Sequence, residues 1–200
     1  MKRSYYIFTL LLFGLNSGLI AQTGNEGVYL SANDFTNGKV SYGHNNTNNK
    51  YEFHLHEISF KTPIKIILDN TIVKLNKDSV YGYRDKKNTC YRYFNKGIFK
   101  ILNPSEKFLL YSNSSVEDGP RNIHRVRNYF FSADATSPIY LLTKWNLKIV
   151  LFKDIYFHEL LDVYFQGDDE LTAYDEINKI YLLNSVYEMS KQSISKMLNN

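Results

Sequence analysis

Apolar and polar residues alternate in short runs through the middle of the chain. Each run is about five residues long, and the gaps between runs hold turn-forming residues such as Asn, Asp, Gly and Pro. A period of two is typical of a β-strand that buries one face, and short polar connections are typical of hairpins. The pattern therefore predicts an antiparallel β-meander with strands at 80–84, 90–94, 98–102 and 108–111, and another strand at 124–131.

The region before the meander gives weaker strand signals. Tyr51, Phe53 and Leu55 alternate with polar residues, and the phase of this alternation shifts by one residue after Glu57, which indicates a bulge or bend. Further apolar runs predict strands at 28–31, 64–68 and 72–75, while polar stretches at 32–49 and 112–122 predict exposed or looser connections.

After about residue 138 the apolar spacing changes from two residues to three or four, which is typical of helices. Thr143 is placed to cap a short helix at 144–151. Asp154 is placed to cap a second helix that reaches Phe165, with Phe157 among its apolar positions.

A third helix is predicted at about 173–191, because Thr172 followed by Asp175 is close to a capping box. The predicted fold class is therefore α+β. An antiparallel, meander-rich sheet over about 28–142 packs against two or three C-terminal α-helices at about 144–191.

The first 22 residues have the order of a secretory signal peptide. Lys2 and Arg3 give a positive start, 5–15 is an apolar run, and Ala21 is a small residue at which cleavage is expected. As a helix the apolar run is about 16 Å long, shorter than the roughly 20 residues that span a bilayer. We expect a signal peptide at 1–21 and a single α+β domain at 22–200, secreted or periplasmic, with no transmembrane segment after cleavage.

Charge and cysteine content narrow the possible partners. Residues 22–200 carry 22 basic and 20 acidic residues, a net charge of +2, which is not the signature of a nucleic-acid-binding protein. We therefore expect no nucleic-acid partner. The single cysteine, Cys90, excludes an internal disulfide, so the fold depends on its hydrophobic core. Cys90 lies in an alternating run and is predicted to be a small buried residue rather than a nucleophile.

His54 and His56 are the candidate metal ligands of this sequence. Residues two apart on a strand point the same way, so their imidazoles can bind zinc or copper together with one or two further ligands. Glu52 shares their face, and His44 is a second possible ligand. The alternative interpretation is an ordinary solvated strand face.

Other charged groups also have both a functional and a structural interpretation. His158-Glu159 lacks the second histidine of a metalloprotease helix, since position 162 is aspartate. The acidic triplet 168–170 suggests either a calcium ligand set or stabilisation of a helix N-terminus. Arg125 and Arg127 share a strand face that is either solvated or able to bind a phosphate or carboxylate. The wider basic patch would add Arg84, Lys86, Lys87 and Arg92.

Two passages resemble a group of uncharacterised exported proteins of Bacteroidota-type bacteria. One is Gly27-Val-Tyr-Leu-Ser-Ala-Asn-Asp-Phe-Thr-Asn-Gly-Lys39, and the other combines 142–147, 157–161 and 171–175. The resemblance implies export and a compact domain. It assigns no activity and gives no residue a role.

The sequence contains no nucleophile elbow, phosphate-binding loop, dinucleotide fingerprint or zinc-knuckle spacing, so no cofactor is expected. Whether the chain is an enzyme stays open. The favoured interpretation is a non-catalytic binding or cell-envelope-associated protein, whose Tyr- and Arg-bearing face contacts a polysaccharide, peptide or protein. The alternative is a small exported hydrolase with a dispersed site, metal-assisted through His54 and His56.

Overall fold

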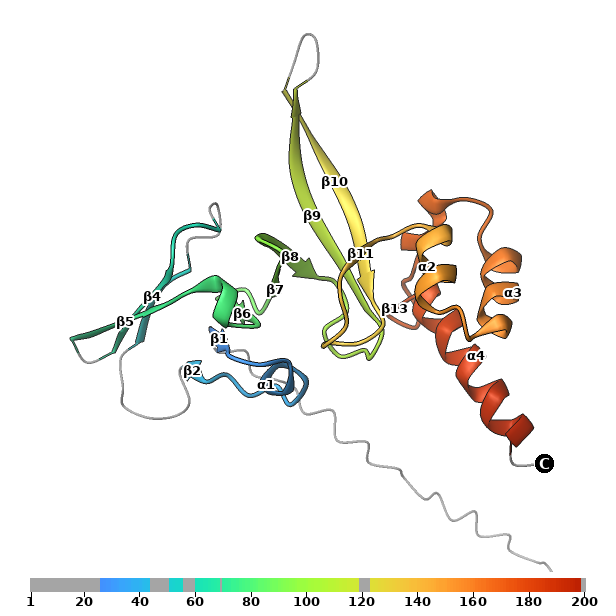
Figure 1. The fold of residues 1–200 in the computed structure, drawn as a ribbon, viewed down its shortest axis with the longest axis horizontal. Helices are drawn as coiled ribbons and strands as arrows, with labels where there is room; N and C mark the ends of the chain where they lie inside the picture. Colours follow the sequence, from blue (N-terminus) through green and yellow to red (C-terminus); the bar gives the residue numbers. More distant parts are fainter. Residues whose placement is uncertain (1–25, 44–50, 56–59, 69, 119–122, 199–200) are drawn as a thin grey trace, which may run out of the picture.

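The computed structural model describes residues 26–43, 51–55, 60–68, 70–118 and 123–198. The predicted signal peptide and the predicted phase shift after Glu57 lie outside these residues. Within them the fold is α+β, as predicted: an antiparallel sheet occupies the first two-thirds of the chain, and three longer helices follow it. Figure 1 shows a small sheet at one end, the main sheet in the centre and the helices at the other end.

The main sheet has eight strands in the order β11-β10-β9-β8-β7-β6-β1-β2, and every neighbouring pair is antiparallel. From β6 to β11 the spatial order follows the chain order, which confirms the predicted meander. Its strands are β1 Gly27–Tyr29, β2 Tyr42–Gly43, β6 Gly82–Arg84, β7 Cys90–Phe94, β8 Gly97–Ile101, β9 Leu109–Asp118, β10 Ile123–Ser132 and β11 Tyr140–Leu141.

The strands before the meander form a second sheet instead of extending the first. It contains β3 Tyr51–His54, β4 Ile64–Leu68 and β5 Thr71–Leu75, joined in the order β3-β4-β5. Asn70 lies in the hairpin turn between β4 and β5 with φ 68°, a conformation that asparagine tolerates better than most residues. Alternation predicted these strands correctly, but it carries no information about which strand is the partner.

Of the two longest strands, β10 agrees with the strand predicted at 124–131, whereas β9 differs from the prediction. The polar stretch from Ser112 onward was expected to be loose, yet β9 continues to Asp118 and pairs with β10 along its whole length. The β9–β10 hairpin extends beyond both covering layers of the sheet (Figure 1). From Ser112 to Asp118 the sequence contains a single apolar residue, Val116, so it shows no apolar period there.

Two of the predicted helix caps are confirmed. Thr143 accepts a hydrogen bond from the backbone N–H of Asn146 at the start of α2 Lys144–Val150. Asp154 accepts one from the N–H of Phe157 at the start of α3 Ile155–Tyr164.

A short helix that was not predicted, α1 Ala32–Thr36, lies within the stretch 32–49. Ser31 and Asp34 form its capping box, in which each side chain bonds the backbone N–H of the other residue. Two 3-10 turns, at Lys77–Ser79 and Asp168–Thr172, complete the short helical segments of the described chain.

The predicted helix at 173–191 begins nine residues late. The hairpin β12 Tyr174–Asp175 and β13 Ile180–Tyr181 occupies its first part, and α4 runs over Leu182–Leu198. Asp175 accepts hydrogen bonds from the N–H groups of Ile177 and Asn178, so its carboxylate closes a turn instead of a helix end. Aspartate is common both at helix starts and in turns, which explains why a helix start was predicted where the hairpin lies.

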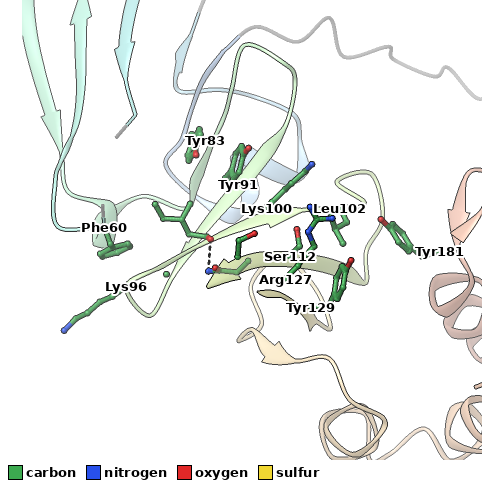
Figure 2. Close-up of a pocket in the computed structure, with 14 residues that line it drawn as sticks. Phe60, Tyr83, Tyr91, Lys96, Lys100, Leu102, Ser112, Arg127, Tyr129 and Tyr181 are labelled. Atoms are coloured by element: carbon green, nitrogen blue, oxygen red, sulfur yellow. Dashed lines mark hydrogen bonds between the residues drawn. The ribbon is translucent and has the colours of Figure 1, made fainter. Parts of the chain in front are cut away.

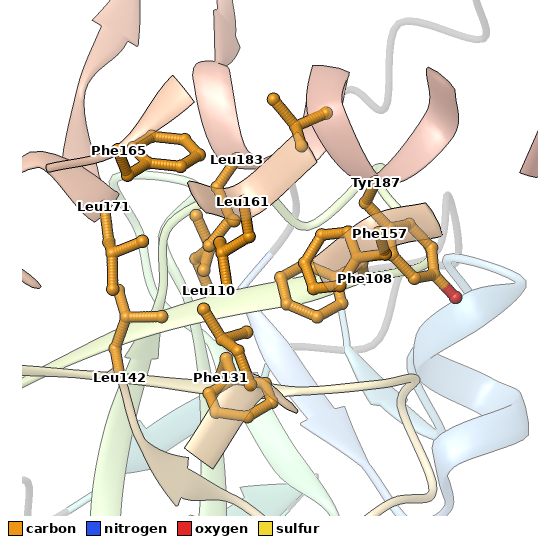
Figure 3. Close-up of a cluster of buried hydrophobic side chains, with 12 residues drawn as sticks. Phe108, Leu110, Phe131, Leu142, Phe157, Leu161, Phe165, Leu171, Leu183 and Tyr187 are labelled. Carbon is orange, nitrogen blue, oxygen red and sulfur yellow. The ribbon is translucent and has the colours of Figure 1, made fainter. Parts of the chain in front are cut away.

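The main sheet is covered unequally on its two faces. On one face, α2, α3 and α4 pack over the base of β9 and β10, where Leu110 and Phe131 form a cross-strand pair (Figure 3). The three-stranded sheet packs over the other end of this same face, against Tyr83 and Tyr93. The opposite face is covered by α1 and by the segment 133–139. One face therefore has two separate covers with a gap between them.

In the part of the chain that the structure describes, no helix has the length and apolar character needed to cross a membrane.

Candidate functional site

A groove of about 730 Å³ lies on the main sheet between its two covers. Phe60 borders it on the side of the three-stranded sheet, and Tyr181 of β13 borders it on the side of the helices (Figure 2). The floor is made by β6, β7, β8, β9 and β10, each of which has a strand partner on both sides over part of its length. The groove is thus a rigid sheet face left open by the arrangement of the covers.

One cross-strand row of five side chains crosses this floor. The register pairs Tyr83 with Tyr91, Tyr91 with Lys100, Lys100 with Ser112, and Ser112 with Tyr129. Directly paired residues point to the same face of a sheet, so all five line the groove. The row places aromatic rings at both ends and polar groups in the middle.

The tyrosines at the first end of the row are held firmly. The rings of Tyr83 and Tyr91 stack with centroids 4.7 Å apart and 9° between their planes. Tyr83 is buried beneath the three-stranded sheet, whereas Tyr91 is only half-buried. Tyr91 therefore offers a ring whose orientation is fixed by its neighbour, which lowers the entropy lost when a ligand packs against it.

The other end of the row is bordered by a second pair of tyrosines. Tyr129 of β10 and Tyr181 of β13 both line the groove. Burial raises the pKa of Tyr181, and the neighbouring hydroxyls of Tyr129 and Tyr174 raise it further. The Tyr181 phenol therefore stays neutral and can donate a hydrogen bond at physiological pH.

Positive charge surrounds the row. Arg127 pairs with Ser114 one step farther along the β9–β10 hairpin and lies on the groove side, and Lys96 lies in the turn between β7 and β8. Together with Lys100 they give the groove three cations, and none of its 14 lining residues is acidic. Among the described residues, none of these three cations forms an ion pair.

Lys96 occupies a costly position in that turn. Asn95 and Lys96 both have positive φ, 44° and 60°, and they form the two-residue connection between Phe94 and Gly97. Asn-Gly is the favoured pair for such a turn, because a lysine in the left-handed region costs about 1 kcal/mol. The chain therefore keeps a cation beside the groove where glycine would be more stable.

A second hollow of about 570 Å³ adjoins the groove and shares Tyr91 and Lys100 with it. Its lining differs in charge, because Glu26 and Asp85 accompany Lys86 and Lys87. Lys86 lies 3.9 Å from the Glu26 carboxylate, so part of this charge is already compensated. With the shared Lys100, the second hollow has three lysines and two acidic residues, so it is less positive than the first groove.

The proposed metal pair stays a prediction. The His54 Nε2 atom lies 3.0 Å from Glu52 Oε1 on the outer face of β3, and His54 lines neither hollow described above. His56 and His44 lie outside the described residues. Within the described ranges, no group of three or more His, Cys, Asp or Glu side chains is arranged to hold a metal ion.

The wider basic patch is divided between the two faces of the sheet. Arg84 and Arg92 are buried on the face opposite the groove, where their guanidinium groups lie over the rings of Tyr29 and Tyr81. Arg92 Nη1 also donates to the Tyr111 hydroxyl at 3.1 Å. Arg127 is thus the one arginine of the predicted patch whose described side chain reaches the groove, since the Arg125 side chain lies outside the described set.

The remaining candidates have structural roles. Asp168 Oδ1 accepts a hydrogen bond from the Lys144 N–H at the start of α2, and Glu170 accepts one from the Gln166 N–H. His158 lies on α3 with its Nε2 atom 3.1 Å from the Leu151 carbonyl oxygen. Cys90 is buried, as predicted, and burial raises the pKa of its thiol, which opposes nucleophilic chemistry.

Sequence reasoning found Arg127 but missed Lys100, Ser112 and Tyr129. Each of them belongs to an ordinary alternating or polar run, and only the strand register brings them into one row. The triplets Tyr-Gly-Tyr at 81–83 and Tyr-Arg-Tyr at 91–93 resemble each other, as adjacent hairpin strands do, and they are the sequence signal for the Tyr83–Tyr91 end of the row. No comparable signal marks the other three.

Comparisons with protein-family models, with curated proteins and with solved structures found no match to this chain.

Proposed function

We propose that this protein is an exported, non-catalytic binding protein that holds a segment of acidic polysaccharide in the groove. The observation that carries the proposal is a row of tyrosines on a rigid sheet face, accompanied by three cations and no acidic side chain. Export is supported by the charged, apolar and small-residue order of residues 1–22.

The chemistry of an acidic sugar matches each part of this surface. A pyranose ring presents a flat face of C–H groups that packs against an aromatic ring such as Tyr91 or Tyr129. Its hydroxyls both donate and accept hydrogen bonds, as does Ser112 at the middle of the row. Its carboxylates form charge-assisted hydrogen bonds with Lys100 and with the planar guanidinium of Arg127.

The floor of the groove argues against a peptide ligand. Extended peptides bind by adding a strand to a free sheet edge, where backbone groups are unpaired. Here the residues of the row are paired on both sides, whereas β9 beyond Ser112 and β10 before Tyr129 pair only with each other. Ligand contacts along the row must therefore come from side chains, which favours a ligand recognised through its rings, hydroxyls and charges.

The test is affinity electrophoresis of the protein in native gels that contain polygalacturonate, with gels containing neutral dextran for comparison. We expect retardation in polygalacturonate alone, and we expect it to weaken as salt is added. Tyr129→Ala should weaken binding about tenfold, from lost ring contact of about 1 kcal/mol or more.

Charge reversal provides the matched comparison. The double variant Lys100→Glu with Arg127→Glu should abolish retardation. A second double variant, Lys39→Glu with Lys107→Glu, changes the net charge equally at exposed sites outside the groove and should bind normally.

Three outcomes would overturn the proposal: equal retardation by dextran, no retardation by any acidic polysaccharide, or identical behaviour of the two double variants. Competition with poly-glutamate and with oligothymidine tests the other polyanions. Stronger binding of either one would reassign the groove to an acidic peptide or to single-stranded nucleic acid.

A further inference from the structure

Three large apolar side chains stand exposed on the outer side of α2. Trp145 is 73% exposed, Ile149 is 53% exposed and Phe152 is 65% exposed. The first two share a helix face at a spacing of four residues, and Phe152 follows three residues later, just beyond the end of the helix. We call these three residues the α2 patch.

The patch is not needed to hold α2 in place. The inner side of the helix is anchored by Leu147, which is buried in the cluster beneath the helices. A third side is anchored by ion pairs to α3, in which Lys144 and Lys148 both bind Asp162 at 3.1 and 2.6 Å. The apolar surface of Trp145 and Phe152 is therefore available to a partner.

Positive charge accompanies the patch. From residue 135 to residue 153 the chain contains three lysines and no acidic residue. Lys144 and Lys148 bind the carboxylate of Asp162, and Asp168 accepts a hydrogen bond from the Lys144 N–H, so the charges of these two lysines are compensated. Lys153 supplies the positive charge at the patch, with its Nζ atom 5.6 Å from the centre of the Phe152 ring.

We propose that the α2 patch docks on the surface of an anionic lipid bilayer. Helices that lie in a membrane interface combine bulky apolar residues such as Trp and Phe on one side with lysines beside them. Tryptophan favours the headgroup level, and each nearby lysine is attracted to acidic headgroups. The proposal does not depend on the ligand of the groove.

Charge disfavours a second copy of the chain as the occupant. A two-fold interface places the same patch against itself, so Lys153 would face an identical lysine. An acidic bilayer compensates this lysine instead of repelling it. The α2 patch therefore fits an anionic lipid surface better than the same patch on a second copy of the chain.

Trp145 makes the test direct, because it is the only tryptophan in the chain. Retention on vesicles is insufficient by itself, since the apolar run at 5–15 in the full chain also favours membranes. We would therefore add equimolar phosphatidylglycerol–phosphatidylcholine vesicles to the full chain and record the tryptophan emission. Vesicles containing brominated lipid then report whether Trp145 reaches the acyl chains.

We expect a blue shift and bromine quenching with the anionic vesicles, both reduced by salt and both weak with pure phosphatidylcholine. Phe152→Asp should lower vesicle partitioning, measured through Trp145, by about tenfold or more. Ile177→Asp is the matched control, because Ile177 is 91% exposed but belongs to the β12–β13 turn and not to the α2 patch, and it should leave partitioning unchanged.

Unchanged, water-exposed tryptophan emission at all lipid concentrations would overturn the proposal. Equal signals with anionic and neutral vesicles would also overturn it, because Lys153 would then have no role. A concentration-dependent blue shift without lipid, together with a dimer in light scattering that Phe152→Asp disrupts, would assign the patch to a second copy.

Discussion

Asp154 is the residue whose removal best tests how the helical end is held together. Its carboxylate is buried and accepts three hydrogen bonds, from the Phe157 N–H at 3.0 Å, the Ser190 hydroxyl at 3.0 Å and the Lys191 ammonium at 2.7 Å. One side chain thus caps α3 and also joins α3 to α4. We predict that Asp154→Ala destabilises the protein more than loss of a cap alone.

The magnitude follows from these contacts. Loss of the cap costs about 1 kcal/mol. Loss of the contact to α4 costs about 1–2 kcal/mol more, because Ser190 keeps its bond to the Tyr187 carbonyl oxygen and the half-exposed Lys191 regains water. A total of about 2–3 kcal/mol corresponds to a fall in Tm of about 4–12 °C for a chain of this size.

Thr143→Ala is the control, since Thr143 caps α2 through the Asn146 N–H and no tertiary hydrogen bond of its side chain accompanies that cap in the described part of the chain. It should cost about 1 kcal/mol. Urea unfolding followed by circular dichroism measures both variants. If Asp154→Ala and Thr143→Ala lower the free energy of unfolding equally, the reasoning about α4 is refuted.

The same carboxylate makes a prediction about pH. Burial by itself would raise the pKa of Asp154, but the hydrogen bonds from Lys191, Phe157 and Ser190 outweigh it and lower this pKa below its ordinary value. A depressed pKa contributes stability that is present above the unfolded-state pKa of about 3.9 and lost as pH falls through the folded value. The stability difference between wild type and Asp154→Asn should therefore shrink below about pH 4.

Three further predictions concern the sheet. Asn103→Ala should cost about 2–4 kcal/mol in urea unfolding, because Asn103 bonds Leu110, Phe108 and Asn184 within the core; a loss below about 1 kcal/mol would contradict this. Gly82→Ala should prevent normal folding, since an added Cβ would lie 1.9 Å from the Tyr91 carbonyl oxygen, and native-like circular dichroism would argue otherwise. Cys90 should react with a thiol reagent only after denaturation, so rapid labelling of the folded protein would disprove its burial.

The sequence predicted local structure well where a single residue decides it. Thr143 and Asp154 cap helices as expected, because a cap depends only on the few residues that follow it. The prediction of a helix start at Thr172 and Asp175 was wrong, because an aspartate that closes a turn has the same sequence signature as one that opens a helix. The outer half of β9 was missed for a different reason, since Val116 is the single apolar residue from Ser112 to Asp118 and the sequence shows no apolar period there.

The groove shows more clearly which features the sequence cannot predict. Arg127 was identified as a candidate because charged residues on a strand are visible in the sequence. Lys100 and Tyr129 became candidates only through the pairing of β8, β9 and β10, which is a long-range property. The division of the strands into two sheets was equally hidden, and it is this division that leaves the groove open.

The register of β9 limits how this protein can change during evolution. Leu110 belongs to the core beneath the helices, and Ser112, two positions later, lies in the groove. Loss or gain of one residue between them would turn every later side chain to the opposite face, exchanging the groove lining for the residues of the other core. Related proteins should therefore vary in length beyond Ser114 and Arg127, toward the hairpin tip, while the spacing inside that point stays constant.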